Sequence, residues 1–204
     1  MPYLLRVELP DVPGSLGRVA TAIGEAGGDI EAIEIVEHPT ADGTAVDDVL
    51  LETAPGTMPD SIVSACNVLD GVRVLWISRY AAGGNLFLDL EAVEELTVHP
   101  AHALDRLIEL IPATFRTDWA ARVRRTSDGA EVVHRSQAAP AEVAWHDVDR
   151  CQQIETDDEN GVLAAAPLGD DLVVVGRRGG PDFLESELAR INHLIGLAVT
   201  ISGS

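Results

Sequence analysis

Along the first 80 residues, the apolar positions recur first at the period of a strand and then at the period of a helix. Apolar residues occupy every second position of Tyr3–Leu9, which predicts a half-buried strand. In the segment 15–26 they recur at the helical spacing, which predicts a helix that ends at Gly27-Gly28. Further strands are predicted over residues 30–37, 45–53 and 72–79.

A second helix completes this part of the chain. Thr57-Met58-Pro59-Asp60 has the form of a capping box, and the helix that it opens stops at Gly71. Asp42-Gly43 predicts a tight turn between two strands, and the last strand is expected to place Val74 and Trp76 on one face. The order βαββαβ predicts a ferredoxin-like fold, with both helices on one face of a four-stranded antiparallel sheet.

The turn between the first strand and the first helix is the best candidate for a binding site. The segment Asp11–Leu16 passes through Pro13-Gly14, so the first backbone N–H groups of the helix point outward and can bind an anion. Gly14 permits a close approach, and Asp11 adds a carboxylate beside the same place. A small zwitterion, such as an amino acid, would satisfy both features. An ordinary helix N-cap that needs no ligand is the alternative.

Composition changes after Ala81-Ala82-Gly83-Gly84-Asn85, and we place a hinge at 81–85. Beyond it the pattern predicts an α+β domain in which residues 136–160 have no clear periodicity. Asp182 and Glu185 resemble a capping box at the start of the last helix. The predicted helices cover 86–96, 100–111 and 182–200, and the predicted strands cover 119–126, 131–135, 162–168 and 172–178, with a turn at 127–129.

Charge and composition limit the possible partners. The chain has 204 residues and a formal net charge of -20, which argues against nucleic acid or an anionic membrane as partner. No apolar run approaches the roughly 20 residues that cross a membrane, and Arg6 and Glu8 interrupt the first apolar stretch. The two cysteines, Cys66 and Cys151, are far apart. We therefore expect a cytoplasmic protein.

No recognised catalytic signature occurs in the sequence, so we expect no enzyme activity. The histidines and cysteines lack metal-ligand spacing, and we expect no cofactor and no metal. The acidic segment 155–161 lacks the glycine and glutamate positions of a calcium loop. Cys66 is expected in the core. Cys151 could be an exposed thiol with a lowered pKa, but it lacks a recognisable histidine partner and we do not favour this alternative.

Several arginines form a second candidate site. Arg122 and Arg124 share a strand face, and Arg177 and Arg178 end a strand nearby. They could form an anion pocket, but we favour solvated side chains paired with the surplus of acidic residues. An enzyme with an unfamiliar site near Arg122, Arg124 and His134 is a further alternative.

The order of elements, the Asp-x-Pro-Gly-Ser-Leu turn and Gly27-Gly28-Asp29-Ile30 together resemble an ACT domain over roughly residues 3–80, and we assign residues 1–80 to an ACT-like domain. This resemblance implies a regulatory module that pairs through its sheets or helices. It also implies that an amino acid lies between the turn of one subunit and the second strand of its neighbour. The matched residues are Asp11, Val12, Gly14, Ser15, Leu16, Asp29 and Ile30. Several amino-acid-binding relatives have Asn where this chain has Asp11 and Asp29, and two carboxylates would favour an ammonium group or a cationic side chain.

Residues 86–204 resemble a GAF-like sensor and dimerisation domain. The resemblance rests on Gly169–Ile201, where a hairpin with the sequence Val-Val-Val-Gly-Arg precedes Phe183 and an amphipathic final helix. Together the two resemblances predict a non-catalytic, allosteric, homodimeric regulatory protein that binds a small amino acid at the ACT-like dimer interface. A regulatory subunit that binds a partner enzyme and has no ligand of its own is the alternative.

Overall fold

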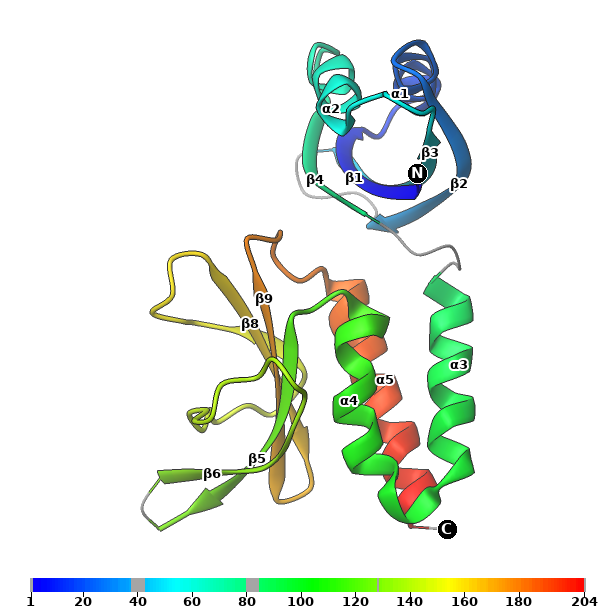
Figure 1. Ribbon diagram of the computed structural model, residues 1–204. Coiled ribbons are helices and arrows are strands. Elements are labelled where there is room, and N and C mark those ends of the chain that lie inside the picture. The colour runs from blue at the N-terminus through cyan, green and yellow to red at the C-terminus, as the bar shows by residue number, and fades with distance from the viewer. Residues whose placement is uncertain (1, 38–42, 80–84, 128, 204) are drawn as a thin grey trace. The chain divides into compact units, whose positions relative to one another are not determined.

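The computed structural model describes residues 2–37, 43–79, 85–127 and 129–203. The chain divides into two compact units, Met1–Ala82 and Gly83–Ser204 (Figure 1). Residues 81–84 of the expected hinge, Asp42 of the first expected turn and Asp128 of the second lie outside the described residues. Asn85 is the first residue of a helix.

The first unit is a four-stranded antiparallel sheet with the strand order β2-β3-β1-β4. Both of its helices lie on one face of this sheet (Figure 1), which confirms the predicted ferredoxin-like arrangement. The elements are β1 (Pro2–Pro10), α1 (Ser15–Glu25), β2 (Gly28–Glu37), β3 (Thr44–Thr53), α2 (Pro59–Asn67) and β4 (Arg73–Arg79).

The core of this unit forms where the alternating residues of β1 meet the two helices. Leu5 and Val7 are fully buried against Ile23 of α1 and Ile62 of α2. Each such side chain contributes about 1.5–3 kcal/mol of burial free energy. Cys66 belongs to the same core, as predicted, and burial raises the pKa of its thiol.

Two local predictions for this unit are wrong. The β1–β4 register shifts between Arg6 and Val7, so that Trp76 lies opposite Arg6 while Val74 lies opposite Val7. This irregularity removes Trp76 from the face that Val74 shares with the core. Helix α2 begins at Pro59, and its N-cap is Met58 with no side-chain cap bond. Thr57 therefore lies one residue too early to cap the helix, which ends at Asn67 and not at Gly71.

The face of the sheet away from the helices contains a buried ion pair. Arg6 on β1 lies opposite Asp48 on β3. The guanidinium donates from Nε to Asp48 Oδ1 at 2.7 Å and from Nη2 to Oδ2 at 2.9 Å. Both side chains are almost fully buried, with 3% and 2% of their surface exposed. A bidentate geometry of this kind offsets part of the cost of removing two charges from water.

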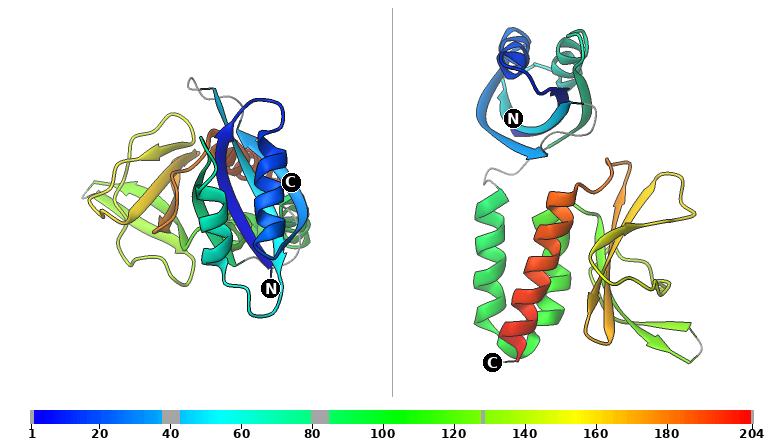
Figure 2. Two further views of the ribbon diagram at one scale, coloured as in Figure 1. Left: turned by 90° about the horizontal axis from the view of Figure 1, so that it is seen from above. Right: turned by 180° about the vertical axis from the view of Figure 1, so that it is seen from behind.

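The second unit is a five-stranded antiparallel sheet with the order β6-β5-β9-β8-β7. Helices α4 and α5 pack on one face, and α3 packs on the outer side of these two helices (Figures 1 and 2). The α+β fold class is confirmed. The elements are α3 (Asn85–Val98), a 3-10 turn (Pro100–His102), α4 (Ala103–Phe115), β5 (Trp119–Thr126), β6 (Gly129–Arg135), β7 (Gln152–Ile154), β8 (Gly161–Leu168), β9 (Asp171–Arg178) and α5 (Glu185–Ser202).

This second sheet is buried on both faces. On the helix side, Ala120, Val173 and Val175 pack against the helices. On the far side, Trp119 and Val174 pack with apolar residues of the segment that joins β6 to β7: Ala139, Val143, Trp145 and Val148. The segment 136–160 therefore covers a sheet face and contains the short strand β7, which the sequence pattern did not predict.

The last helix starts three residues later than predicted. Asp182 accepts a hydrogen bond from Gln153 Nε2 and does not cap the helix. The backbone N–H of Leu184 donates instead to Glu187 Oε2 at 3.0 Å. The carboxylate that closes the first turn is thus Glu187 and not Glu185.

Candidate functional site

The predicted turn between β1 and α1 is formed by its own backbone hydrogen bonds. The N–H of Asp11 donates to Gly43 O at 2.9 Å, and the N–H of Ser15 donates to Val12 O at 3.2 Å. Gly14 is the N-cap of α1 and has φ 93 in the left-handed region, which only glycine adopts without strain. The carboxylate of Asp11 and the side chain of Val12 are exposed.

The first turn of α1 leaves donors available for a ligand. Within the described residues, the N–H groups of Leu16 and Gly17 have no acceptor, as expected for the start of a helix. Ser15 is 3% exposed, and its Oγ is buried without a described hydrogen-bond partner. Leu16 packs against the core of the unit. The turn therefore offers two backbone donors, while the N–H of Ser15 is already bound.

A shallow hollow of about 370 Å³ runs along the exposed face of α1. Of the predicted site residues, Gly14 borders it, and sequence reasoning missed the others: Gly17, Arg18, Thr21, Ala22, Glu25 and Leu69. Most of these follow Gly14 at helical spacing, so the period of α1 could have identified this face. The hollow brings an exposed arginine and an exposed glutamate to the same helix face.

Asp29 and Ile30 lie far from the turn within one copy of the chain. Asp29 pairs with Glu52 near the end of β3, whereas Pro10 pairs with Thr44 at its beginning. Eight residues of strand separate these positions, which is roughly 25 Å. Asp29 is exposed and Ile30 packs partly on the core. Within one copy of the chain, the predicted turn and the pair Asp29 and Ile30 therefore do not form a single site.

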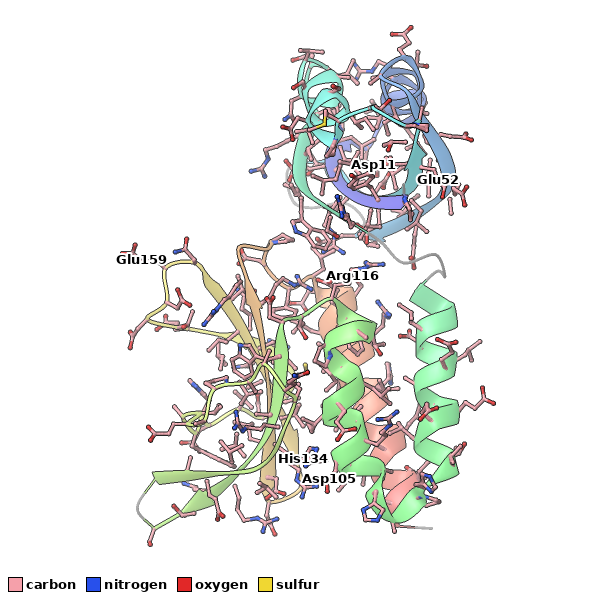
Figure 3. All side chains as sticks on the ribbon, in the orientation of Figure 1. Asp11, Glu52, Asp105, Arg116, His134 and Glu159 are labelled. Atoms are coloured by element: carbon pink, nitrogen blue, oxygen red, sulfur yellow. The ribbon has the colours of Figure 1, made fainter. Side chains whose placement is uncertain are left out.

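The arginines of the second unit mostly pair with acids, as we favoured. Arg124 donates to both carboxylate oxygens of Asp171, at 2.7 and 3.0 Å. Arg122 Nη1 lies 3.0 Å from Asp105 Oδ1. His134 reaches Glu109 at 3.3 Å and lies beside Asp105 (Figure 3). These contacts connect α4 to the sheet and leave little of the cluster free for an anion.

Arg177 is not solvated as we expected, and the structure also contradicts the alternative of an activated thiol at Cys151, which we did not favour. Arg177 is 4% exposed and not solvated, because its Nη2 donates to Glu187 Oε1 at 2.9 Å and to Phe115 O at 3.1 Å. Cys151 is partly buried against the helix-side core. Burial, with a smaller contribution from the charge of Glu185, raises the pKa of its thiol to about 11, so it is not an activated thiol.

Across the described part of the chain, no three His, Cys, Asp or Glu side chains are arranged to hold a metal ion. None of its helices there combines the length and apolarity needed to traverse a bilayer.

Comparison with known proteins agrees with the fold of the first unit. Residues 3–57 match the family model of the ACT domain, which confirms that resemblance. A segment of 33 residues is 64% identical to NAD-dependent malic enzyme 1 of Bacillus subtilis (strain 168). That match covers 16% of this chain and 8% of the enzyme, so the chain corresponds to a small part of this relative.

Solved structures show weaker likenesses. A GAF domain of a phosphoenolpyruvate-protein phosphotransferase from Acinetobacter is 10% identical, with a TM-score of 0.45 over 60% of this chain and 95% of that one. A formyltetrahydrofolate deformylase from Pseudomonas putida KT2440 is 9% identical, with a TM-score of 0.32 over 48% of this chain and 38% of that one. An unknown protein from Galdieria sulphuraria is 11% identical, with a TM-score of 0.34 over 99% and 91%.

Proposed function

We propose that this chain is a non-catalytic regulatory protein whose first unit binds a small amino acid between two copies. The observation that carries the proposal is the turn at Gly14. It presents the free N–H groups of Leu16 and Gly17 beside the exposed carboxylate of Asp11, within the segment that matches the ACT domain. Helix N-termini of this kind favour a carboxylate.

In the proposed complex, the carboxylate of the amino acid accepts hydrogen bonds from the start of α1. Its ammonium group contacts Asp11, and Asp29 and Ile30 of a second copy close the site. A second copy is needed because Asp11 and Asp29 lie at opposite ends of β3 in one chain. A ligand that contacts both copies stabilises the dimer by mass action, by about 2.7 kcal/mol at a hundred times its Kd. The second unit would then respond to the change in assembly.

We expect isothermal titration of the full chain with each of the twenty amino acids to give heat for one or a few of them. Replacing Gly14 with alanine strains the turn, and we expect at least a tenfold loss of affinity. Gly56→Ala is the matched control, because Gly56 also has φ 93 and open space around it. It should cost similar stability without changing the affinity.

Two charge variants test the role of the carboxylates. Asp11→Asn and Asp29→Asn should each weaken binding and ligand-induced dimerisation, measured by native mass spectrometry, while Glu31→Gln on the same strand as Asp29 should not. If a folded chain gives no heat with any amino acid, the proposal is wrong. A stoichiometric enzyme partner found under those conditions would support the alternative of a ligand-free regulatory subunit.

A further inference from the structure

The loop ahead of β8 contains a chemically fragile dipeptide, Asn160-Gly161. It is the one place in the sequence where glycine follows asparagine. Asparagine is among the thermolabile residues of proteins, and a following glycine has no side chain to hinder attack on its amide. Asn160 is exposed, and its neighbour Glu159 lies at the tip of this loop (Figure 3). The amide of Asn160 is therefore open to water.

The reaction of this amide needs only the adjacent backbone and water. The nitrogen of Gly161 attacks Cγ of Asn160, the Cγ–Nδ2 bond breaks, and ammonia leaves with the amide proton of Gly161. The product is a cyclic imide. Water then opens the imide at Cγ to give aspartate, or at the main-chain carbonyl carbon to give isoaspartate. In isoaspartate the chain continues through the former side chain, so the backbone is one carbon longer.

The fold holds the peptide group between Asn160 and Gly161 on both of its sides. The N–H of Gly161 donates to Asp158 O at 2.9 Å, which closes a turn with Glu159 and Asn160 at its centre. The C=O of Asn160 accepts from the N–H of Gly179 at 2.8 Å. We call these two hydrogen bonds the Asn160–Gly161 clamp.

The clamp keeps the attacking nitrogen away from its target. Asn160 has no positive φ, so the turn is of type I, in which the third residue has ψ of about 0°. At this ψ the nitrogen of Gly161 lies to one side of Cβ of Asn160. The imide ring forms only after the rigid peptide group has rotated by a large angle. That rotation breaks both hydrogen bonds of the clamp.

Asp158 stabilises the turn and explains why residue 161 is glycine. Its Oδ1 accepts from the N–H of Asn160 at 3.1 Å, and its own N–H donates to Thr156 Oγ1 at 3.2 Å. A Cβ atom at Gly161 would lie 3.1 Å from both Cβ and Oδ2 of Asp158. Gly161 has no positive φ, so the close approach of Asp158 favours glycine here, and the backbone conformation does not. The turn thus requires the residue that makes the dipeptide fragile.

The clamp also closes one end of the β8–β9 ladder. Gly161 pairs with Arg178 in the first pair of this ladder, and Gly179 is the next residue. Isoaspartate at position 160 moves the main-chain carbonyl by one carbon, so the N–H of Gly179 loses its acceptor. Conversion therefore loosens this end of the second sheet without cutting the chain.

We propose that Asn160 is a site of irreversible self-modification to aspartate and isoaspartate, and that opening of the Asn160–Gly161 clamp sets its rate. The attack takes place only in molecules in which the clamp is open. The same local opening exposes the N–H of Gly161 to exchange with solvent. The fold should therefore slow the deamidation of Asn160 and the hydrogen exchange of Gly161 by the same factor. This inference is independent of the proposed amino-acid site at Gly14.

The rate of deamidation is measured on the full chain at mildly alkaline pH, without denaturant and in concentrated urea. Mass spectrometry follows the peptide that contains Asn160, and electron-transfer fragmentation distinguishes isoaspartate from aspartate. We expect the native chain to react at least tenfold more slowly than the chain in urea. The protection factor of the Gly161 amide, measured by hydrogen exchange, should equal this ratio within threefold. The other asparagines, which precede Val68, Leu86 and His193, should stay unmodified over the same period.

Two variants of equal charge test the role of the turn. Asp158→Ala frees the N–H of Asn160, and it should speed deamidation of the native chain at least fivefold without changing the rate in urea. Asp157→Ala is the control, because it removes the same charge one residue earlier and takes part in neither bond of the clamp. It should change the native rate less than twofold.

Four outcomes would overturn the inference. Equal rates in the native chain and in urea would show that the clamp does not restrain the peptide group. A native rate slowed far more than the exchange of Gly161 would show that another contact controls the reaction. An unmodified Asn160 in urea would show that it is no modification site. Equal acceleration by Asp158→Ala and Asp157→Ala, both confirmed as folded by circular dichroism, would attribute the effect to local charge and not to the turn.

Discussion

Asp48→Ala is expected to lower the free energy of unfolding of the first unit by about 3–5 kcal/mol. The substitution removes the bidentate carboxylate that the buried guanidinium of Arg6 contacts, and breaking a buried ion pair by removing one partner costs this much. The two side chains are 2% and 3% exposed in the structure, so water cannot replace the lost partner without local opening. This is a large share of the stability of a small domain.

This loss can be measured from the hydrogen-exchange rates of the β1 and β3 amides in the variant and in the unsubstituted chain. These rates report the stability of the first unit separately from the unfolding of the second unit. Glu8→Ala is the control. Glu8 on β1 pairs with Arg73 on the neighbouring strand β4, but the arginine of that pair is 67% exposed. Exposed pairs contribute about 0–1 kcal/mol. Equal effects of the two substitutions would contradict the burial of the Arg6–Asp48 pair.

A double replacement separates charge from packing. In Arg6→Met, Asp48→Leu neither charge of this pair remains, and the two apolar side chains occupy a similar volume. We expect this variant to recover most of the stability that Asp48→Ala loses, because hydrophobic replacement of a buried ion pair is often neutral or stabilising.

Local periodicity was sufficient to predict the elements of the first unit, because β1, α1 and β3 each show a single clear repeat. The same alternation led to a wrong picture of one face of the sheet. Arg6 and Asp48 occupy polar positions of their strands, which a period of two assigns to solvent. Their burial depends on a register between residues 42 positions apart. The irregularity that moves Trp76 to the other face is equally non-local.

Candidate sites likewise differ in whether their residues are consecutive in the sequence or come from distant segments. The turn at Gly14 could be predicted because its chemistry lies in six consecutive residues. The hollow bordered by Trp119, Pro140 and Leu163 on the far face of the second sheet could not, since its walls come from β5, β8 and the aperiodic segment 136–160. Apolar residues of that segment, such as Val143 and Trp145, pack singly onto the sheet. A segment that covers a sheet in this manner needs no repeat, so hydrophobic periodicity cannot reveal it.

Glu187→Ala should destabilise the second unit by about 3–5 kcal/mol, because one carboxylate there serves two buried contacts. Its Oε1 accepts from Arg177 at 2.9 Å, and its Oε2 accepts from the N–H of Leu184 ahead of α5 at 3.0 Å. Without Glu187, Arg177 keeps its hydrogen bonds to the carbonyls of Phe115 and Pro181 and its contact with the ring of Phe183, whose centroid is 4.4 Å from the guanidinium carbon. Neither carbonyl carries the charge that compensates a buried guanidinium.

Glu185→Ala is the control for this prediction, since Glu185 lies in the same first turn but is exposed. Its loss removes only a favourable interaction with the helix dipole, about 0.3–1 kcal/mol. Glu187→Gln keeps an acceptor for Leu184 and loses the charge, so it should fall between the two. Exchange rates of the α5 and β9 amides measure all three variants. If Glu187→Ala and Glu185→Ala cost the same, the carbonyls alone suffice for Arg177, and the ion pair is not what holds α5 to β9.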